Sequence, residues 1–192
     1  MESAIKEIID VANRLYKKNL NGGYGGNLSI RIDDRELLIT RSGIPKVNLQ
    51  EDDIAIIDID GHFLKGKPSS EYKMHLYTYQ RCPNIKAILH AHPPCLMGMA
   101  LAGISPPTEK FPETNMLVGH IPLSAYFPSG SDALAVDVAE KFKNGAMAVL
   151  MENHGITVVS EESLWDAYYK LEAIEHVCMA NMVAKTLKGA IE

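Results

Sequence analysis

The sequence predicts an α/β fold built on one central sheet. Apolar residues recur at helical spacing near both ends of the chain, and several short apolar stretches between them alternate like strands. No internal repeat, low-complexity tract or linker divides the chain. This pattern predicts helices on both sides of the sheet, in a single domain over residues 1–192. It leaves parallel and antiparallel pairing of the strands equally open.

The first half of the chain predicts two helices around a group of strands. The N-terminal stretch is amphipathic and ends at NLNGG, and SEYKMHLYTYQR is helix-like with Ser70 as its N-cap. Between them, LSIRI and RELLIT alternate on either side of a DD turn and predict a hairpin, and DIAIIDIDG predicts a further strand before FLKGK. The predicted ranges are helices at 2–20 and 70–81 and strands at 28–32, 35–40 and 53–61.

The second half predicts four strands and three helices. Ser129 or Ser131 is placed to cap the helix of DALAVDVAEKFKN, and the proline-rich stretch 103–115 predicts a loop. The predicted ranges are strands at 85–91, at 119–124 and on both sides of the turn ENHG, and helices at 95–103, 132–144 and 161–188. The long last helix is expected to turn six side chains toward the core: Leu164, Tyr168, Leu171, Ile174, Cys178 and Met182.

Charge and cysteine content argue against several classes of protein. The formal net charge is −5 without a basic run, so neither a nucleic-acid nor an anionic-membrane partner is predicted. The N-terminal stretch carries charges throughout, unlike a signal peptide, and no apolar run approaches the roughly 20 residues that span a bilayer. Cys82, Cys95 and Cys178 are odd in number and form no CxxC pair. We therefore expect reduced thiols in a cytoplasmic protein.

Two histidines end the predicted strand AILHAHPP. On a strand, His90 and His92 project to one face together with Ile88, which suits two imidazoles that share a metal ion. A bare HxH is equally typical of a polar strand end. A third histidine, His154, stands before a glycine in the turn ENHG, and three neutral imidazoles leave an open position on Zn²⁺. The remaining four are expected to be surface or core histidines: His62, His75, His120 and His176.

Three turns of small residues could form a neutral anion site. PSSE precedes the second predicted helix, and helix N-termini bind anions. Taken alone, PSSE is better explained as a helix cap with an acidic first turn than as an anion site. GGN at 25–27 is also compatible with a flexible turn, and RSG at 41–43 with the end of a strand. If the three converge, they present hydroxyls, an asparagine and glycine N–H groups to a phosphate.

Five segments together resemble a known family. GGNLSIR, LLITRSGIP, GKPSSEYKMHLYTYQ, AILHAHPP and MENHGI occur in family order between about residue 6 and residue 185. In this respect the chain resembles the class II aldolase/adducin family and, within it, the L-fuculose-1-phosphate aldolases. The resemblance implies a single-domain α/β fold with a central, mainly antiparallel nine-stranded sheet. It also implies a C4 homotetramer with active sites between neighbouring subunits.

The resemblance also implies roles for individual residues. By position, His90, His92 and His154 are similar to the ligands of one Zn²⁺ per subunit, and Glu71 is similar to the catalytic acid/base, which can also ligate zinc in the resting state. Six positions match the family's phosphate-binding residues, a site that requires no Lys or Arg: Gly26, Asn27, Ser42, Gly43, Ser69 and Ser70.

The implied reaction is the reversible cleavage of a ketose 1-phosphate. The products would be dihydroxyacetone phosphate and a short aldehyde such as L-lactaldehyde, with zinc stabilising the enediolate and Glu71 moving the proton. Other branches of the family stay open. A decarboxylase of phosphorylated oxo-acids keeps a similar S-x-E, 4-epimerases carry SSD instead of SSE, and a dehydratase branch has its glutamate after HxH, where Glu109 and Glu113 stand. A non-enzymatic adducin-like module would lack the histidine ligands that are present here.

The residues on the aldehyde side depart from the family pattern. The L-fuculose-1-phosphate aldolases use a tyrosine where this chain has Phe111, and Tyr126 is the phenol nearby. The chain ends at KGAIE, short of the tail that carries a second tyrosine in those enzymes. The sequence therefore leaves the identity of the aldehyde open. It also does not distinguish zinc from another divalent metal.

Overall fold

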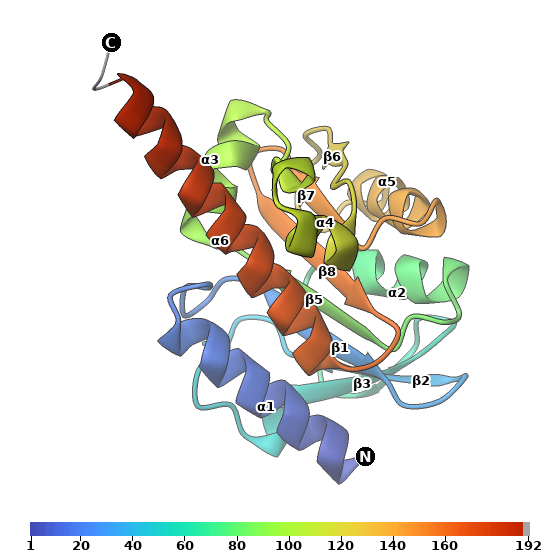
Figure 1. Ribbon diagram of the computed structural model, residues 1–192. Coiled ribbons are helices and arrows are strands. Elements are labelled where there is room, and N and C mark those ends of the chain that lie inside the picture. Colours follow the sequence, from blue (N-terminus) through green and yellow to red (C-terminus); the bar gives the residue numbers. More distant parts are fainter. Residues whose placement is uncertain (190–192) are drawn as a thin grey trace.

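The architecture was obtained as a computed structural model that describes residues 1–189 (Figure 1). The helices are α1 (Glu2–Lys17), α2 (Tyr72–Arg81), α3 (Pro94–Ala102), α4 (Pro112–Val118), α5 (Asp132–Lys143) and α6 (Leu164–Gly189), with short 3₁₀ turns η1 (Glu51–Asp53) and η2 (Thr108–Lys110). The strands are β1 (Asn27–Arg31), β2 (Glu36–Thr40), β3 (Ile54–Asp58), β4 (Phe63–Lys65), β5 (Ala87–Ala91), β6 (Leu123–Ser124), β7 (Ala148–Met151) and β8 (Gly155–Ser160).

One sheet holds all the strands, in the order β4-β3-β2-β1-β5-β8-β7-β6. Every neighbouring pair is antiparallel except β6 and β7, so the mainly antiparallel sheet is confirmed. The expected number of nine strands was wrong, because residues 1–189 form eight. One further pairing in this part of the chain is a single bridge between Arg41 and Pro68. Proline has no N–H to donate, so this bridge does not grow into a ladder.

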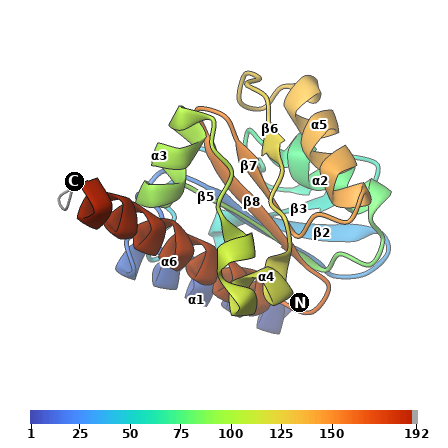
Figure 2. The same cartoon turned by 45° about the horizontal axis from the view of Figure 1, so that its top comes forward.

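Helices cover both faces of the sheet, as predicted. Figures 1 and 2 show α1, α3 and α6 on one face and α2 and α5 on the other. The side chains of β5 alternate between the two layers: Leu89 and Ala91 join the core beneath α1 and α6, and Ile88 joins the core beneath α2 and α5. This alternation decides which way the histidine at position 90 faces.

The starts of α5 and α2 differ from each other. Ser131 caps α5, because its hydroxyl accepts the N–H of Leu134 at 3.2 Å, as one of the two predicted serines should. The predicted cap of α2 by Ser70 was wrong. Glu71 is the N-cap residue there, without a side-chain cap, and the upstream Ser69 hydroxyl accepts the Glu71 N–H at 3.3 Å. The hydroxyl of Ser69 therefore serves the turn before the helix.

Two further expectations in the second half needed correction. The predicted loop at 103–115 contains η2 and the start of α4, where Pro112 occupies the first helical turn. Proline is well tolerated at that position because its missing N–H would have no partner there. In α6, the predicted core side chains are buried except Met182, which is 49% exposed.

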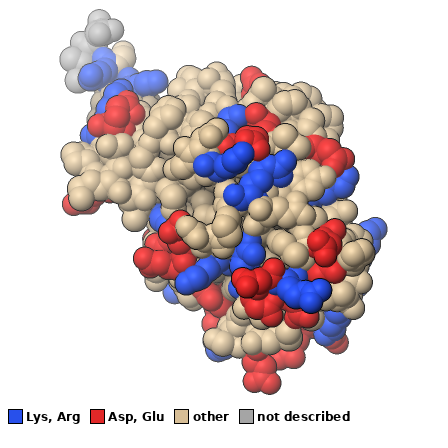
Figure 3. Space-filling view, turned by 90° about the vertical axis from the view of Figure 1, so that its right-hand side faces the viewer, with Lys and Arg blue, Asp and Glu red and all other residues tan. Residues whose placement is uncertain are grey.

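Three further observations concern the helices, the surface charges and the cysteines. No helix within residues 1–189 is long and apolar enough to cross a membrane. Figure 3 shows basic and acidic side chains lying beside one another on the face it presents. Cys82, Cys95 and Cys178 are free thiols, as predicted.

Candidate active site

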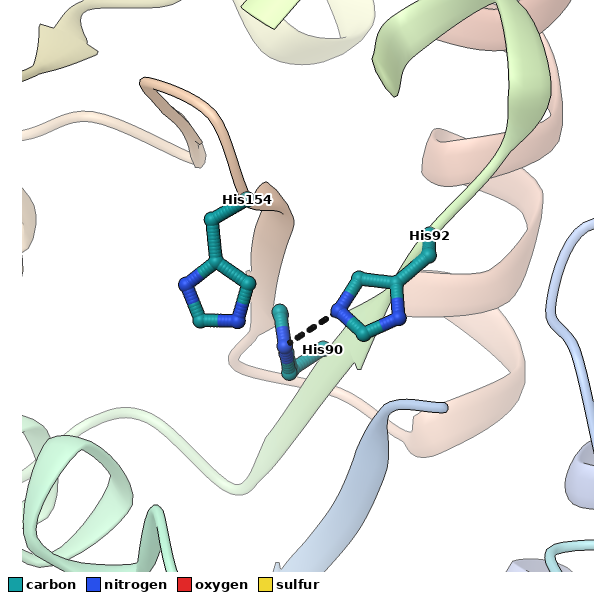
Figure 4. Close-up of side chains that lie close together, drawn as sticks. All are labelled: His90, His92 and His154. Carbon is teal, nitrogen blue, oxygen red and sulfur yellow. Dashed lines mark hydrogen bonds between the residues drawn. The ribbon is translucent and has the colours of Figure 1, made fainter. Parts of the chain in front are cut away.

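Strand β5 delivers the first two histidines to one point at its C-terminal end. His90 is fully buried, and its Nδ1–H donates to the carbonyl of Ile156 on β8 at 2.9 Å. That bond directs Nε2 of His90 toward Nε2 of His92, which lies 3.1 Å away (Figure 4). The predicted common direction of the two side chains is therefore what the structure shows.

The turn between β7 and β8 delivers the third histidine. Asn153 takes a left-handed backbone conformation with φ of 56°, which turns the chain tightly enough to aim His154 back over β5. The ring centroid of His154 lies 4.8 Å from that of His90 and 5.4 Å from that of His92 (Figure 4). One nitrogen of each ring lies within 4.8 Å of the others, so the three can ligate a single ion.

Two glycines enclose the ring of His92. A Cβ on Gly155 would lie 2.4 Å from His92 Cδ2 and 2.6 Å from the carbonyl oxygen of Ala91, and a Cβ on Gly25 would lie 2.6 Å from His92 Nδ1. Any larger residue at either position would displace the ring or the strand behind it. The glycine that follows His154 in ENHG is thus required by close approach to the HxH strand.

Glu71 brings its carboxylate to the same point from the start of α2. Its Oε2 lies 3.1 Å from His90 Nε2 and accepts a hydrogen bond of 3.2 Å from Nδ2 of Asn27. Its Oε1 lies 3.4 Å from His154 Nε2, is buried, and has no hydrogen-bond partner. A buried carboxylate oxygen without a partner is costly in an apo protein, and a cation ligated by the adjacent imidazoles would satisfy it.

The charge states of these groups follow from their surroundings. Burial lowers the pKa of His92 to about 3 and that of His154 to about 4, with His90 adding to both effects. Both rings are therefore neutral near pH 7 and present lone pairs. Burial raises the pKa of Glu71, but the interactions with His90, His154 and Asn27 together hold it well below its ordinary value. The carboxylate is therefore ionised at neutral pH.

The three small-residue turns converge on this point. They line one cavity of about 220 Å³ together with Glu71, His92 and His154. All six residues predicted to bind phosphate lie on its wall: Gly26, Asn27, Ser42, Gly43, Ser69 and Ser70. The turns at GGN, RSG and PSSE therefore lie together in this structure, as a phosphate site built from them would require.

The cavity wall also contains residues that the sequence analysis missed. Tyr24, Ser129 and Lys46 line it, so the wall is not free of a cationic side chain. Lys46 is buried, its Nζ donates to the carbonyl of Ile44 at 2.7 Å, and burial lowers its pKa. No motif marks these three residues. Lys46 reaches the wall because its backbone N–H pairs with the carbonyl of Gly23 in the neighbouring turn.

Other residues singled out in the sequence lie away from the cavity. Phe111 and Tyr126 are not on its wall, and Tyr126 is 60% exposed. Glu109 and Glu113 are exposed on η2 and α4 and give no support to the dehydratase interpretation. The remaining histidines are on the surface or in the core, as expected: His62, His120 and His176 are exposed, and His75 is buried.

Comparison with known proteins agrees with this geometry. Residues 6–182 match the family described as "Class II Aldolase and Adducin N-terminal domain". The chain belongs to this family. An "L-fuculose phosphate aldolase" of Methanococcus maripaludis (strain S2) is 35% identical over 188 residues, which cover 96% of this chain and 99% of that protein.

Two further relatives broaden the picture. A "3-oxo-tetronate 4-phosphate decarboxylase" of Escherichia coli (strain K12) is 33% identical over 181 residues, which cover 91% of this chain and 84% of the relative. A solved structure of an "L-fuculose 1-phosphate aldolase" superposes with a TM-score of 0.89 at 32% identity, covering 97% of this chain and 88% of that one. The family and its α/β fold are thus shown, and the relatives carry out more than one reaction.

Proposed function

We propose that this protein is a zinc-dependent aldolase, a class II aldehyde-lyase. It would reversibly cleave a ketose 1-phosphate, such as L-fuculose 1-phosphate, into dihydroxyacetone phosphate and a short aldehyde such as L-lactaldehyde. The observation that carries the proposal is one cavity whose wall joins an ionised Glu71, the imidazoles of His92 and His154, and three hydroxyl-rich turns. The aldolase relatives, similar over nearly the whole chain, support it.

The residues at the histidine cluster suit a zinc ion, one in each subunit. The proposed ligands are His90, His92 and His154, three imidazoles of the kind that zinc accepts at catalytic sites while one position stays open. The two Nε2 atoms that face each other at 3.1 Å are separated as two ligands of one tetrahedral ion would be. Glu71 would be a fourth ligand of the resting site, which its buried Oε1 without a hydrogen-bond partner supports.

Glu71 would act as the acid/base of the reaction. Zinc, when bound, would supply Lewis-acid stabilisation of the negative charge that develops on the dihydroxyacetone half. The low pKa of Glu71 keeps it as the carboxylate, the form that accepts a proton from the substrate carbon in the condensation direction. The same group returns that proton in cleavage. Its Oε2 accepts a hydrogen bond from Asn27, which would hold the carboxylate in one orientation toward a bound substrate.

The phosphate of the substrate would lie against the three turns. Ser42, Ser69 and Ser70 offer hydroxyl donors, and the backbone around Gly26 and Gly43 offers N–H groups. Both glycines have positive φ, 66° and 75°, a backbone form that lets successive N–H groups point into one hollow. A substrate held there would direct its carbonyl end toward the histidines, since the same cavity reaches both.

A panel of phosphorylated ketoses tests the proposed reaction. Retro-aldol cleavage would be assayed over several ketose 1-phosphates, with zinc added and with zinc chelated, by coupled detection of dihydroxyacetone phosphate. We expect cleavage of at least one member that disappears on chelation and returns with zinc. The absence of cleavage over the whole panel would contradict the aldolase proposal.

A decarboxylase is the second candidate function. The Escherichia coli decarboxylase at 33% identity favours it, and both reactions leave an enolate beside a phosphorylated chain. Release of CO₂ from a phosphorylated 3-oxo acid, without cleavage of the ketose panel, would move the assignment to this branch. Two further branches have less support, since 4-epimerases carry Asp where this chain has Glu71, and an adducin-like assembly module would lack the three histidines.

Glu71→Gln tests the acid/base role directly. Glutamine keeps the size and one oxygen of the side chain but cannot take up the proton, so turnover should fall about 10²- to 10⁴-fold. Zinc content should stay within twofold of wild type, because the three histidines are untouched. Near-normal turnover in this variant would remove Glu71 from the mechanism.

We also propose a cytoplasmic homotetramer, in which residues 1–192 form one domain and active sites lie at subunit interfaces. Apolar side chains exposed on the adjoining helices α3 and α6 support an interface there: Met97, Leu101, Met179, Met182, Val183 and Leu187. The three free thiols are typical of a reducing compartment. Sedimentation velocity at micromolar concentration should give four chains, and a stable monomer would contradict the assembly.

A further inference from the structure

A buried chain of hydrogen bonds runs from the core to the Glu71 carboxylate. Tyr79 Oη lies 2.9 Å from Ser29 Oγ, and Ser29 Oγ lies 2.6 Å from Nδ1 of His75. Nε2 of His75 is hydrogen-bonded to Oδ1 of Asn27, whose Nδ2 donates to Glu71 Oε2 at 3.2 Å. All five residues are at most 6% exposed, so water competes little for these bonds.

The backbone places the five side chains by simple spacing. Glu71, His75 and Tyr79 stand four residues apart at the start and along one face of α2. Asn27 and Ser29 stand two residues apart on β1 and therefore project to the same side of the sheet. Each link of the chain joins the helix to the strand, so it is a product of packing α2 against β1.

The direction of every hydrogen bond in this chain follows from its end. Asn27 donates through its Nδ2 to Glu71 Oε2, and its Oδ1 therefore faces Nε2 of His75. Nε2 of His75 must then carry the hydrogen. His75 is neutral, because burial lowers its pKa to about 3, so its Nδ1 is an acceptor.

The remaining two bonds are fixed in the same way. Since Nδ1 of His75 accepts, the Ser29 hydroxyl donates to it, and the Tyr79 hydroxyl donates to Ser29. In this series of hydrogen bonds, every donor therefore points along the series toward Glu71. With the Asn27 amide donating to Glu71, no other orientation gives each of these bonds one donor and one acceptor.

We propose that His75 is a positioning residue for the acid/base: its Nε2–H locks the Asn27 amide in the orientation that donates to Glu71. This inference rests on the proposed function, in which Glu71 transfers the proton. Without the donor from His75, the Asn27 amide is free to turn and bring its oxygen against the carboxylate, which repels Glu71 from its place. A small displacement of a proton-transfer group lowers turnover while leaving the binding of the rest of the substrate in place.

The test compares variants along the chain of hydrogen bonds. His75→Leu removes the donor and should lower kcat about 10- to 100-fold, with KM, zinc content and inhibition by inorganic phosphate within about twofold of wild type. His75→Gln can place an amide N–H near Asn27 and should recover most of kcat. Tyr79→Phe is the matched control, because Ser29 still donates to His75, and kcat should stay within about twofold. Thermal melting of each variant shows whether it is folded.

The outcomes that would overturn the proposal are distinct. One is an unchanged kcat in a folded His75→Leu. Another is a loss of kcat that follows the loss of thermal stability equally in the His75 and Tyr79 variants, as a purely packing role would give. If His75→Leu does not fold, Ser29→Ala takes its place, since loss of the donor to Nδ1 frees the tautomer and should lower kcat.

A measurement that does not use activity separates this proposal from the proposed reaction. Side-chain ¹⁵N NMR of the zinc-loaded wild-type protein should show His75 as the neutral Nε2–H tautomer. The Nδ1–H tautomer would overturn the positioning role. Correct tautomer with no cleavage of any substrate would instead count against the aldolase reaction alone.

Discussion

Within residues 1–189, two groups of side chains could hold a metal ion, and they differ in the hydrogen bonds of the carboxylates beside them. His90, His92 and His154 meet at the end of β5, and a second group with ligand atoms equally close lies in the turn between β3 and β4. The second group consists of Asp58, Asp60 and His62. Closeness of ligand atoms therefore does not by itself distinguish a metal centre from a turn.

The distinction lies in the hydrogen bonds of the carboxylates. Asp58 accepts from the backbone N–H groups of Asp60 and His62 and from the His62 ring, so both of its oxygens are occupied by the turn. Glu71, in contrast, has one buried oxygen without a partner. The turn of Asp58, Asp60 and His62 is complete without an ion, whereas a cation at the three histidines would satisfy the buried oxygen of Glu71.

The largest effect is expected when one histidine is removed from each of the two groups. His92→Ala should remove zinc and reduce turnover to background, by more than about a thousandfold, because several kcal/mol of charge stabilisation go with the metal. His62→Ala, the matched change in the surface group, should leave both unchanged. Zinc analysis and turnover of the two purified variants measure this. Equal effects of the two substitutions would mean that the clusters do not differ as described.

Buried and surface histidines should change the free energy of unfolding in opposite directions as the pH falls. In the metal-free protein, the folded-state pKa is about 3 for His75 and His92 and about 4 for His154, well below the ordinary 6.5. As the pH falls from about 6.5 to about 4, the unfolded chain takes up protons that the folded chain does not. The free energy of unfolding should then fall by up to about 1.4 kcal/mol per pH unit for each such histidine.

The surface histidine should act in the opposite direction. The hydrogen bond that His62 donates to the Asp58 carboxylate raises the pKa of His62, so the contribution of His62 to stability is present at low pH and is lost as the pH rises through its folded-state pKa. Urea unfolding of the metal-free protein between pH 4 and 8 measures the free energy of unfolding, to which the buried histidines and His62 both contribute. Stability that is highest at pH 4 would show that the buried histidines are not held neutral.

Gly155, which packs against the ring of His92, allows a test of the packing around the histidine cluster. Gly155→Ala should lower the free energy of unfolding by about 1–3 kcal/mol, because the new Cβ meets the His92 ring and the Ala91 carbonyl oxygen. Gly22→Ala is the control, since a Cβ there has no heavy atom within 4 Å. It should change stability by no more than about 0.5 kcal/mol. Urea denaturation compares the two, and equal losses would contradict the close approach at position 155.

The smallest effect is expected in the acids of the surface turn. Asp58→Asn keeps the oxygen that accepts the two backbone N–H groups and removes only an exposed ion pair with His62. The melting temperature should shift by no more than about 2 °C, and turnover should not change. Differential scanning calorimetry checks the first point. A loss of zinc in this variant would mean that the turn of Asp58, Asp60 and His62 holds the metal, which would contradict its assignment to the three histidines.

Local patterns in the sequence were enough to predict most of the fold. The alternation in AILHAHPP places His90 and His92 on one face, and the glycine after His154 indicates a turn, because both depend on neighbours within a few residues. The proline-rich stretch was mistaken for a loop, since Pro112 is as compatible with the first turn of a helix as with a turn. The strand count came from resemblance and was one too high.

Contacts between distant segments could not be predicted in the same way. His75 was assigned to the surface or the core, and its bond to Asn27 joins residues 48 positions apart. The spacing of Glu71, His75 and Tyr79 on α2 was present in the sequence as a signal. It acquires meaning only when α2 is known to pack against β1. Lys46 reached the cavity through a backbone contact between two irregular turns, for which no periodic pattern exists.

Zinc titration of the metal-free protein tests the central claim most directly. Isothermal calorimetry would be run on the wild type, His154→Ala and His62→Ala under the same conditions. We predict one tight zinc site per chain in the wild type and in His62→Ala, and none in His154→Ala. One tight site that persists in His154→Ala, or that is lost in His62→Ala, would contradict the assignment of the metal to the three histidines at the end of β5.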